Sequence, residues 1–382
     1  MLLHNPMVRD ARVQREAAAL AQAGREVTVL ALAEDGLPAT EEGHGFRIHR
    51  VARATTVSMR RPLSKFRQAG ARKRALIDAA VALNPDVVHC HDTDTLAAGR
   101  AAADRAGAKL IYDAHELYPD MAIPGRMRAA IRRAYWLRVE RSQVPHVDAT
   151  VTVSEGLAAV LRDRYAVDSV VVRNVPRLHP IDHGRMLREE YGLDADAVVL
   201  ICQGVLNEGR GLPQLLDAMR LVSRPAVLVI QGDGRIRERM QARAAELGVE
   251  DRVRFTGFVP MNDLHAYACD ADIGVAIYEN ASLNNYLSLP NKLFAYLMAG
   301  IAVVSSDFPG LSSVVSGQDI GETFDPASPQ SIAAAINDLV EDETRRKRAG
   351  DRARVLAETE YNWDMESQRL LDLYERLAQA TA

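Results

Sequence analysis

The chain has 382 residues, which suits two ordinary domain cores better than one. Its 48% hydrophobic and 26% charged residues are typical of a folded globular protein and exclude a disordered chain. No apolar run reaches the roughly 18 residues that a membrane span requires. The first residues, from Met1 to Asn5, lack the basic and apolar regions of a signal peptide. We therefore expect a cytoplasmic protein.

The three cysteines, Cys90, Cys202 and Cys269, are far apart and lie in or beside apolar segments. Their spacing fits neither a disulfide framework nor a zinc site. We interpret them as small buried core residues in a reducing compartment, which again favours the cytoplasm.

The net charge of −4 is unevenly distributed. Residues 1–176 carry 26 Lys and Arg against 20 Asp and Glu, whereas the remainder carries 21 against 31. The basic excess lies in segment 60–74, which contains no acid, and in segment 126–141, which contains only Glu140. Each segment is either a solvated helix face or a contact with an anionic partner, namely the inner face of a membrane or a phosphorylated acceptor. Nucleic acid is disfavoured, because acids dominate elsewhere and no nucleic-acid-binding motif occurs.

The first half of the chain alternates short β-branched runs with longer amphipathic stretches. The runs predict strands at residues 27–30, 86–90, 109–112 and 149–153. Ahead of the first run, Val13, Ala17 and Leu20 share one helical face, and Gly24 fits the end of that helix. An initial strand would begin at Met1 itself, and a start codon further upstream is one explanation for so short a strand.

A proline-containing stretch, residues 173–180, interrupts this pattern and predicts a linker. The alternation then restarts, with strands predicted at residues 198–202, 226–230, 273–277 and 301–305. Strands that alternate with helices form parallel sheets covered on both faces. We therefore predict an α/β fold of two doubly wound, Rossmann-like domains, residues 1–173 and 174–362. Because ligands bind at the carboxyl ends of such strands, we expect the site in a central cleft between them.

Glycines follow the predicted strands of the second half closely. Gly204, Gly232, Gly234 and Gly257 each come within a few residues of a strand end. Such glycines let a phosphate or a base approach the backbone, although singly they mark only tight turns. The dinucleotide-binding fingerprint is missing after the first strand, which disfavours a dehydrogenase.

Two cations are placed to meet an anion at the same strand ends. Arg210 follows the first strand of the second domain directly ahead of a predicted helix, and Lys292 follows Pro290, a residue suited to a helix start. Taken alone, each could be a solvated surface charge. Together they indicate a clamp for a diphosphate.

These residues belong to a longer pattern. It comprises Gly204-Val205-Leu206 with Arg210-Gly211, Gly232-Asp233-Gly234, Gly257-Phe258-Val259, the run from Ser288 to Gly300 and, in the first half, Asn5-Pro6, Asp10 to Val13, and Asp113-Ala114-His115-Glu116. The pattern resembles the retaining glycosyltransferases of family four, which have the GT-B fold, in the variant with Pro-Asn-Lys in the donor motif. The resemblance covers nearly the whole chain, and motif order and spacing both agree.

The resemblance implies roles for individual residues. Arg210 and Lys292 would hold the donor diphosphate, His115 would contact the donor sugar, and these three would form the catalytic set. The implied donor-binding set is Gly204, Arg210, Gly232, Gly257, Phe258, Val259, Pro290, Asn291, Lys292 and Leu293. The implied acceptor-side set is Asn5, Asp10, Arg12, His91 and Glu116. The final helix, residues 363–380, would pack back on the first domain. His89 and His91 form a His-x-His pair that could suggest a metal, but the family works without one, so we expect neither metal nor cofactor.

Three positions depart from the family pattern. The two spaced glutamates of the donor motif fall at Leu287 and Ala295, and the arginine expected after Gly204 is Val205. Position 295 normally carries the carboxylate that bonds the ribose hydroxyls. Glu279, a few residues upstream, is either a substitute for that carboxylate or a solvated loop acid.

The sequence therefore predicts a metal-independent, retaining hexosyltransferase. It would use a nucleotide diphosphate sugar, with UDP favoured, and an unknown acceptor that is anionic or lipid-linked. Two alternatives stay open: a catalytically degenerate GT-B partner subunit, and a sugar-nucleotide epimerase of the same fold.

Overall fold

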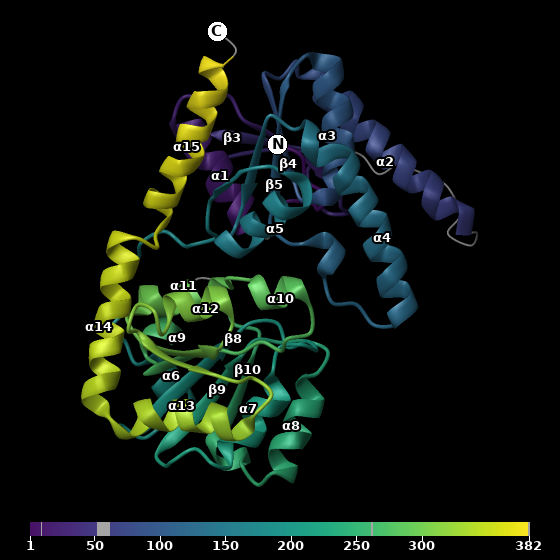
Figure 1. The fold of residues 1–382 in the computed structure, drawn as a ribbon. Coiled ribbons are helices and arrows are strands. Elements are labelled where there is room, and N and C mark those ends of the chain that lie inside the picture. The colour runs from purple at the N-terminus through teal and green to yellow at the C-terminus, as the bar shows by residue number, and fades with distance from the viewer. Residues whose placement is uncertain (9, 52–61, 261–262, 381–382) are drawn as a thin grey trace. The chain divides into compact units, whose positions relative to one another are not determined.

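The computed structural model describes residues 1–8, 10–51, 62–260 and 263–380, with only the backbone for residues 62–69. The chain divides into two compact units (Figure 1). Unit 1 comprises Met1–Val172 and Glu366–Ala382, and unit 2 comprises Arg173–Met365. The final segment of the chain thus belongs to the unit that contains the amino terminus.

Unit 1 is built on parallel strands with one antiparallel edge. Its strands are β1 (Thr28–Leu32), β2 (Thr40–Gly43), β3 (Phe46–Val51), β4 (Val87–His91), β5 (Lys109–Ala114), β6 (Ala149–Thr152) and β7 (Ser169–Val171). Their hydrogen-bonded orders are β1-β3-β2 and β4-β5-β6-β7, and Leu2 makes single parallel bridges to Leu30 and Cys90. Among the described strands of unit 1, only β2 and β3 pair antiparallel. Neither strand was predicted, and in β2 the Glu41-Glu42-Gly43 stretch is polar and largely exposed.

The helices of unit 1 follow the strands, as crossover connections require. They are α1 (Ala11–Gln22), α2 (Pro62–Ala82), α3 (Thr93–Ala106), α4 (Arg126–Gln143), α5 (Glu155–Tyr165) and α15 (Trp363–Gln379), with 3-10 turns η1 (Tyr118–Asp120) and η2 (Val144–His146). One core cluster joins α2 and α3 to the sheet through Leu76, Leu96, Leu110 and Tyr112. The predicted helix 363–380 therefore exists as α15.

Unit 2 has a six-stranded, all-parallel sheet in the order β10-β9-β8-β11-β12-β13. The strands are β8 (Val198–Gln203), β9 (Ala226–Gln231), β10 (Val253–Gly257), β11 (Ile273–Ala276), β12 (Ala302–Ser306) and β13 (Gly321–Phe324). Its helices are α6 (Met186–Tyr191), α7 (Leu212–Met219), α8 (Arg237–Glu246), α9 (Leu264–Cys269), α10 (Leu283–Leu287), α11 (Asn291–Ala299), α12 (Pro309–Val314), α13 (Pro329–Glu341) and α14 (Glu343–Thr359), with the turn η3 (Glu250–Arg252).

Burial along β8 shows why this sheet is doubly wound. All six of its residues are buried, and neighbouring side chains enter different cores. Leu200 belongs to the cluster formed with α7, α8 and α13, whereas Ile201 belongs to the cluster formed with α9, α11 and α14. Successive side chains of a strand point to opposite faces, so an apolar run without alternation requires helices on both sides. The second-half strands were predictable for this reason.

The structure bears on the predictions for the cysteines and for the basic segment 60–74. Cys90 and Cys202 are buried, but Cys269 is only half-buried at the end of α9, so the prediction that it is a core residue is wrong. Of the basic segment 60–74, Arg60 and Arg61 lie outside the described residues and the side chains of Lys65 and Arg67 are not described. Within the described residues, no helix has the length and apolar character to cross a bilayer.

Candidate functional site

Three glycine turns lie side by side at the carboxyl ends of β8, β9 and β10. The amide of Gly204 donates to Gln231 O (2.9 Å) and the amide of Gly232 donates to Gly257 O (3.0 Å). A Cβ atom at Gly232 would come within 2.0 Å of Gly204 O, and the φ angle of Gly232 is +136°. Only glycine fits this close approach of two backbones. The structure thus brings together three of the predicted donor-binding glycines at one sheet edge.

The two predicted clamp cations lie over one aromatic ring. The guanidinium carbon of Arg210 is 4.8 Å from the centroid of Tyr278, and Lys292 Nζ is 5.2 Å from it. Arg210 comes from the β8–α7 connection and Lys292 from the first turn of α11, so two separate segments deliver positive charge to one place. No carboxylate in the described part of the chain forms an ion pair with either cation. Two cations held together without an acid indicate an anion site.

The first turn of α11 adds backbone donors beside Lys292. Pro290 occupies the position before the helix, and Asn291 is its first residue. The first amides of a helix have no partner within it, and the helix dipole places partial positive charge there. Leu293 is fully buried, so its contribution to a ligand can come only from the backbone.

The end of β10 presents the residues predicted to hold the nucleotide base. Phe258 is 69% exposed, whereas Val259 is buried. Beside them, Gln203 Nε2 donates to Gln231 Oε1 across the ends of β8 and β9, and Gln231 Nε2 is buried with no hydrogen-bond partner among the described residues. A buried amide without a partner costs free energy unless a ligand or a water meets it. These amides were missed at the sequence level.

The two positions that carry glutamates in the family lie in α10 and α11. Leu287 ends α10, and Ala295 lies half-buried in the middle of α11. Glu279 lines a separate pocket of about 530 Å³ together with Asp307 and Asp325. Neither Ala295 nor the two cations line that pocket in the described chain. The amide of Glu279 donates to Gly209 O (3.0 Å), so the backbone of Glu279 adjoins the clamp, while the pocket that it lines contains two further carboxylates.

In unit 1, His115 follows β5 and is held between two carboxylates. Its Nε2 lies 3.2 Å from Asp113 Oδ2, and its Nδ1 lies 3.6 Å from Asp92 Oδ2. The backbone amide of His115 also donates to Asp92 Oδ1 (3.1 Å). Asp92 follows β4 with a φ angle of +65°, a conformation that non-glycine residues rarely adopt. Backbone strain of this kind is concentrated at functional sites.

Arg12 completes the charge pattern beneath His115. Its Nη2 bonds both carboxylate oxygens of Asp113 (3.1 and 3.0 Å), and its Nε lies 2.9 Å from Glu16 Oε1. Arg12 is only 3% exposed and Asp113 is fully buried. An acceptor therefore cannot touch Arg12 directly in this conformation, and the same applies to His91, which is 2% exposed. We interpret both as supports for His115, and their predicted place on the acceptor side stays a prediction.

These contacts set the protonation states. Burial raises the pKa of Asp113, but the charges of Arg12 and His115 overcome that effect and hold it well below its usual range. Burial opposes protonation of His115, yet Asp113 and Asp92 raise its pKa to about 9. Burial raises the pKa of Glu16 to about 8, although Arg12 opposes the shift. At neutral pH the site thus presents a protonated His115, which is 17% exposed.

Four buried side chains approach the arrangement of a metal site. Ligand atoms of Glu16, His89, His91 and Asp113 all lie within 4.8 Å of one another. However, Arg12 already bonds both carboxylates, so a guanidinium supplies the positive charge that a cation would bring. His89 Nδ1 is also 2.8 Å from the hydroxyl of Tyr374 in α15. The residues present therefore fit an ion-pair network better than a metal.

The other acceptor-side candidates lie at the start of α1 and after β5. Asp10 accepts a hydrogen bond from the amide of Val13 and caps α1, and Asn5 Nδ2 donates to Asp10 Oδ2 (2.9 Å). Glu116 is half-buried next to His115. Asn5 and Asp10 thus have a structural task that accounts for them.

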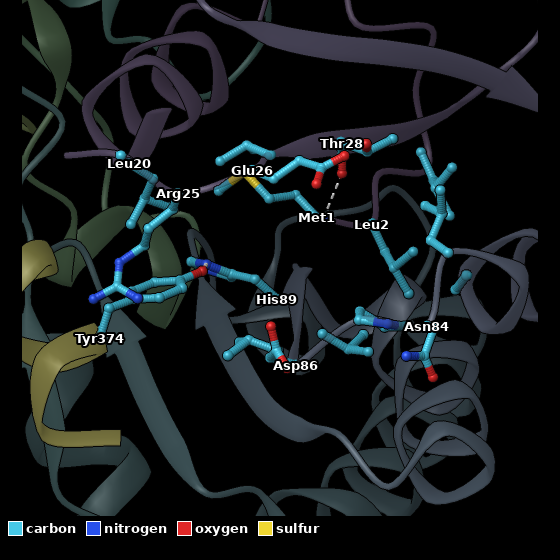
Figure 2. Close-up of a pocket in the computed structure, with 18 residues that line it drawn as sticks. Met1, Leu2, Leu20, Arg25, Glu26, Thr28, Asn84, Asp86, His89 and Tyr374 are labelled. Atoms are coloured by element: carbon cyan, nitrogen blue, oxygen red, sulfur yellow. Dashed lines mark hydrogen bonds between the residues drawn. The ribbon is translucent and has the colours of Figure 1, made fainter. Parts of the chain in front are cut away.

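Unit 1 also contains a pocket of about 430 Å³ at the amino ends of β1 and β4 (Figure 2). Met1, Thr28, Asp86 and His89 line it, and the α-ammonium of Met1 donates to Thr28 O. Burial lowers the pKa of that ammonium to about 6. Ligands of open α/β sheets bind at the carboxyl ends of the strands, so we do not assign the site to this pocket.

Asp92 and Tyr278 are two further functional candidates that sequence reasoning missed. Asp92 follows the His-x-His pair and could have been singled out as a polar residue at a strand end. Tyr278 follows an apolar strand and reads as a core residue, which its 6% exposure supports. Nothing in the sequence indicates that two cations share its ring.

Two units with parallel sheets, one with two cations at its glycine turns that pair with no carboxylate in the described chain, are the arrangement expected of a GT-B glycosyltransferase. Residues 11–177 match the model of Glycosyltransferase Family 4, and residues 185–356 match that of Glycosyl transferases group 1. The chain belongs to the GT-B glycosyltransferases. The predicted GT-B fold is thereby confirmed.

Individual relatives agree with this assignment. The GDP-mannose-dependent alpha-(1-6)-phosphatidylinositol monomannoside mannosyltransferase of Mycolicibacterium smegmatis is 27% identical over 307 residues, which are 74% of this chain and 76% of the relative. Sucrose-phosphate synthase from Thermosynechococcus elongatus superposes with a TM-score of 0.84 at 19% identity, over 99% of this chain and 98% of that chain. HepE of Anabaena, solved with UDP-glucose, superposes with a TM-score of 0.75 at 15% identity, over 98% of each chain.

Proposed function

We propose that the protein transfers a hexose-type sugar from a nucleoside diphosphate sugar to an anionic or lipid-linked acceptor, with retention of anomeric configuration and without a metal. The observation that carries the proposal is the pair Arg210 and Lys292, which share the ring of Tyr278 and have no carboxylate partner in the described chain. Such a pair, with the first amides of α11, suits the charge that develops on a departing diphosphate.

In this mechanism, Arg210, Lys292 and the α11 amides bind the diphosphate and stabilise its charge as the bond to the sugar breaks. The acceptor attacks from the face that the diphosphate leaves. His115, held protonated by Asp113 and Asp92, donates a hydrogen bond to the donor sugar, as the family resemblance implies. The guanidinium of Arg12 keeps Asp113 ionised for that task.

The names of relatives and neighbours support the proposed donor and acceptor classes. HepE was solved with UDP-glucose, and the mycobacterial relative is named for GDP-mannose and a phosphatidylinositol monomannoside. We propose a UDP-linked hexose as the donor. We also propose that segments 60–74 and 126–141 make peripheral contact with the inner face of a membrane that carries the acceptor.

A binding panel followed by product analysis tests the proposal. Calorimetry with UDP, GDP and their hexose derivatives should show one preferred nucleotide, and a donor at ~100 times its Kd should add about 2.7 kcal/mol of stability. The anomeric proton of the product should show the configuration of the donor. Activity should survive EDTA. Isomerised donor formed without an acceptor would instead show an epimerase.

Absence of binding by every nucleotide would favour the partner-subunit alternative, which Ala295 motivates. That residue leaves the ribose without the carboxylate usual in the family. The binding panel therefore distinguishes an active transferase from a partner subunit before any acceptor is known.

A further inference from the structure

Helix α4 of unit 1 presents apolar and basic side chains to solvent together. Met127, Ile131 and Tyr135 recur every four residues and are 78%, 66% and 58% exposed. Residues four apart lie on one face of a helix, so these side chains form a continuous stripe. Large apolar side chains exposed singly need no explanation, but a stripe of three on one helix indicates a contact surface.

Arginines border this stripe. Arg128, Arg138 and Arg141 are exposed, and none pairs with a carboxylate in the described chain. By helical spacing Arg128 precedes Ile131 by three residues and Arg138 follows Tyr135 by three, which places both on the same face. Arg133, by contrast, is paired with Asp120 (3.0 Å).

The only acid of α4 points into the protein. Glu140 is 1% exposed, and its carboxylate accepts hydrogen bonds from Thr93 Oγ1 (2.9 Å) and from the hydroxyl of Tyr165. Val144, just past the helix, is fully buried. The carboxyl end of α4 is therefore anchored to unit 1, and Figure 1 shows the helix beside α3. No negative charge of the helix itself neutralises the outward arginines.

We propose that the outward face of α4, namely Met127, Arg128, Ile131, Tyr135, Arg138 and Arg141, is a docking surface for an anionic lipid bilayer. Arginines beside a row of apolar and aromatic side chains match a surface of negative headgroups above an apolar interior. Tyrosine suits the boundary between them, because its ring is apolar and its hydroxyl is polar. This inference deepens the proposed function by assigning the membrane contact to one helix face, but its test involves no donor.

The test is flotation of the full chain with vesicles of phosphatidylcholine alone or with 30% phosphatidylglycerol. We expect binding to the anionic vesicles only, weakened by raised salt. Replacing Arg128, Arg138 and Arg141 by Gln should reduce the partition coefficient about a hundredfold. Each cation near an anionic surface contributes a factor of about five, and the three factors multiply. Replacing Met127, Ile131 and Tyr135 by Ser should reduce it at least ~10-fold.

A charge-matched control removes three exposed arginines elsewhere: Arg220→Gln, Arg352→Gln and Arg376→Gln. This variant should bind anionic vesicles as the wild type does. Melting temperatures and nucleotide binding should be unchanged in all variants, which separates loss of docking from loss of fold or of donor binding.

Three results would overturn the proposal. They are no binding of the wild type to anionic vesicles, retained binding in both α4 variants, or equal loss in the control variant. A concentration-dependent dimer that the α4 variants abolish, without vesicle binding, would show that the face joins two copies of the chain instead.

Discussion

The diphosphate clamp gives the sharpest test of the donor site. We expect Arg210→Gln or Lys292→Gln to lower kcat about 10²–10³-fold, because each removes one preorganised donor to a developing charge. Binding of the free nucleoside diphosphate should weaken about 10- to 100-fold, since one charge-assisted hydrogen bond contributes roughly 1.5–3 kcal/mol.

The same substitutions should leave stability nearly unchanged. Each cation lies about 5 Å from the same ring centroid, so their charges are at most about 10 Å apart. At an effective dielectric constant of 20, their repulsion is then at least about 1.7 kcal/mol before screening by salt. Removing one cation relieves this repulsion and loses a cation–π contact of about 0.5–1 kcal/mol. The free energy of unfolding should therefore not fall by more than about 1 kcal/mol.

Steady-state kinetics, calorimetry with a nucleoside diphosphate and thermal denaturation check these numbers. The matched control is Arg239→Gln, which removes an exposed arginine of unit 2 that pairs with Glu208. Wild-type kinetics in both clamp variants would refute the assignment. A fall in melting temperature as large as the loss of activity would show that the cations are structural.

Four further predictions concern the groups around the reaction. With Tyr278→Leu, nucleotide affinity should fall several-fold as the cations lose their ring, whereas Tyr278→Phe should retain it; equal losses in both would refute the ring's role. His115→Ala should impair transfer while leaving nucleoside diphosphate binding unchanged. Because the pKa of His115 is raised to about 9 from 6.5, its stabilising protonation is complete below pH 6.5 and is lost as the pH rises through 9. Activity should fall over that alkaline limb, and Asp92→Asn should move the limb to lower pH, as pH–rate profiles would show. Ala295→Glu should tighten binding of a nucleoside diphosphate about tenfold in calorimetry by restoring a ribose acceptor; weaker binding would mean that ribose recognition has been rebuilt.

The sequence predicts the parts of this site that depend on local pattern. The central strands β8, β9 and β11 of unit 2 are largely apolar because both faces of the sheet are covered, and glycines follow β8 and β9 because the backbones approach there. Strand β2 was missed because its residues are polar and lack the alternation of a half-buried strand. Strand β3 does alternate buried and exposed residues, so the sequence contained a signal for it. Local pattern therefore gives the elements and the sheet edge at which ligands bind.

Contacts between distant segments could not be predicted in the same way. Arg12 looks like a surface charge of an amphipathic helix until Asp113, 101 residues later, is seen to neutralise it. Tyr278 meets the clamp because β11 lies next to β8 in the sheet, an order that sequence pattern does not reveal. A charged side chain is buried where an oppositely charged partner meets it. The order of the strands decides which distant residues can meet.

Ala295 gains significance from the charges around it. In a site with a glutamate at this position, the carboxylate would bond the ribose and also offset part of the positive charge of Arg210 and Lys292. Here the described chain supplies no acid that pairs with those cations, and Glu279 lines the separate pocket with Asp307 and Asp325. In the proposed donor site, we therefore expect the diphosphate to contribute more of the binding free energy than the ribose. Contacts with the departing diphosphate strengthen as its negative charge develops in the transition state. The loss of the ribose contact is therefore compatible with catalysis.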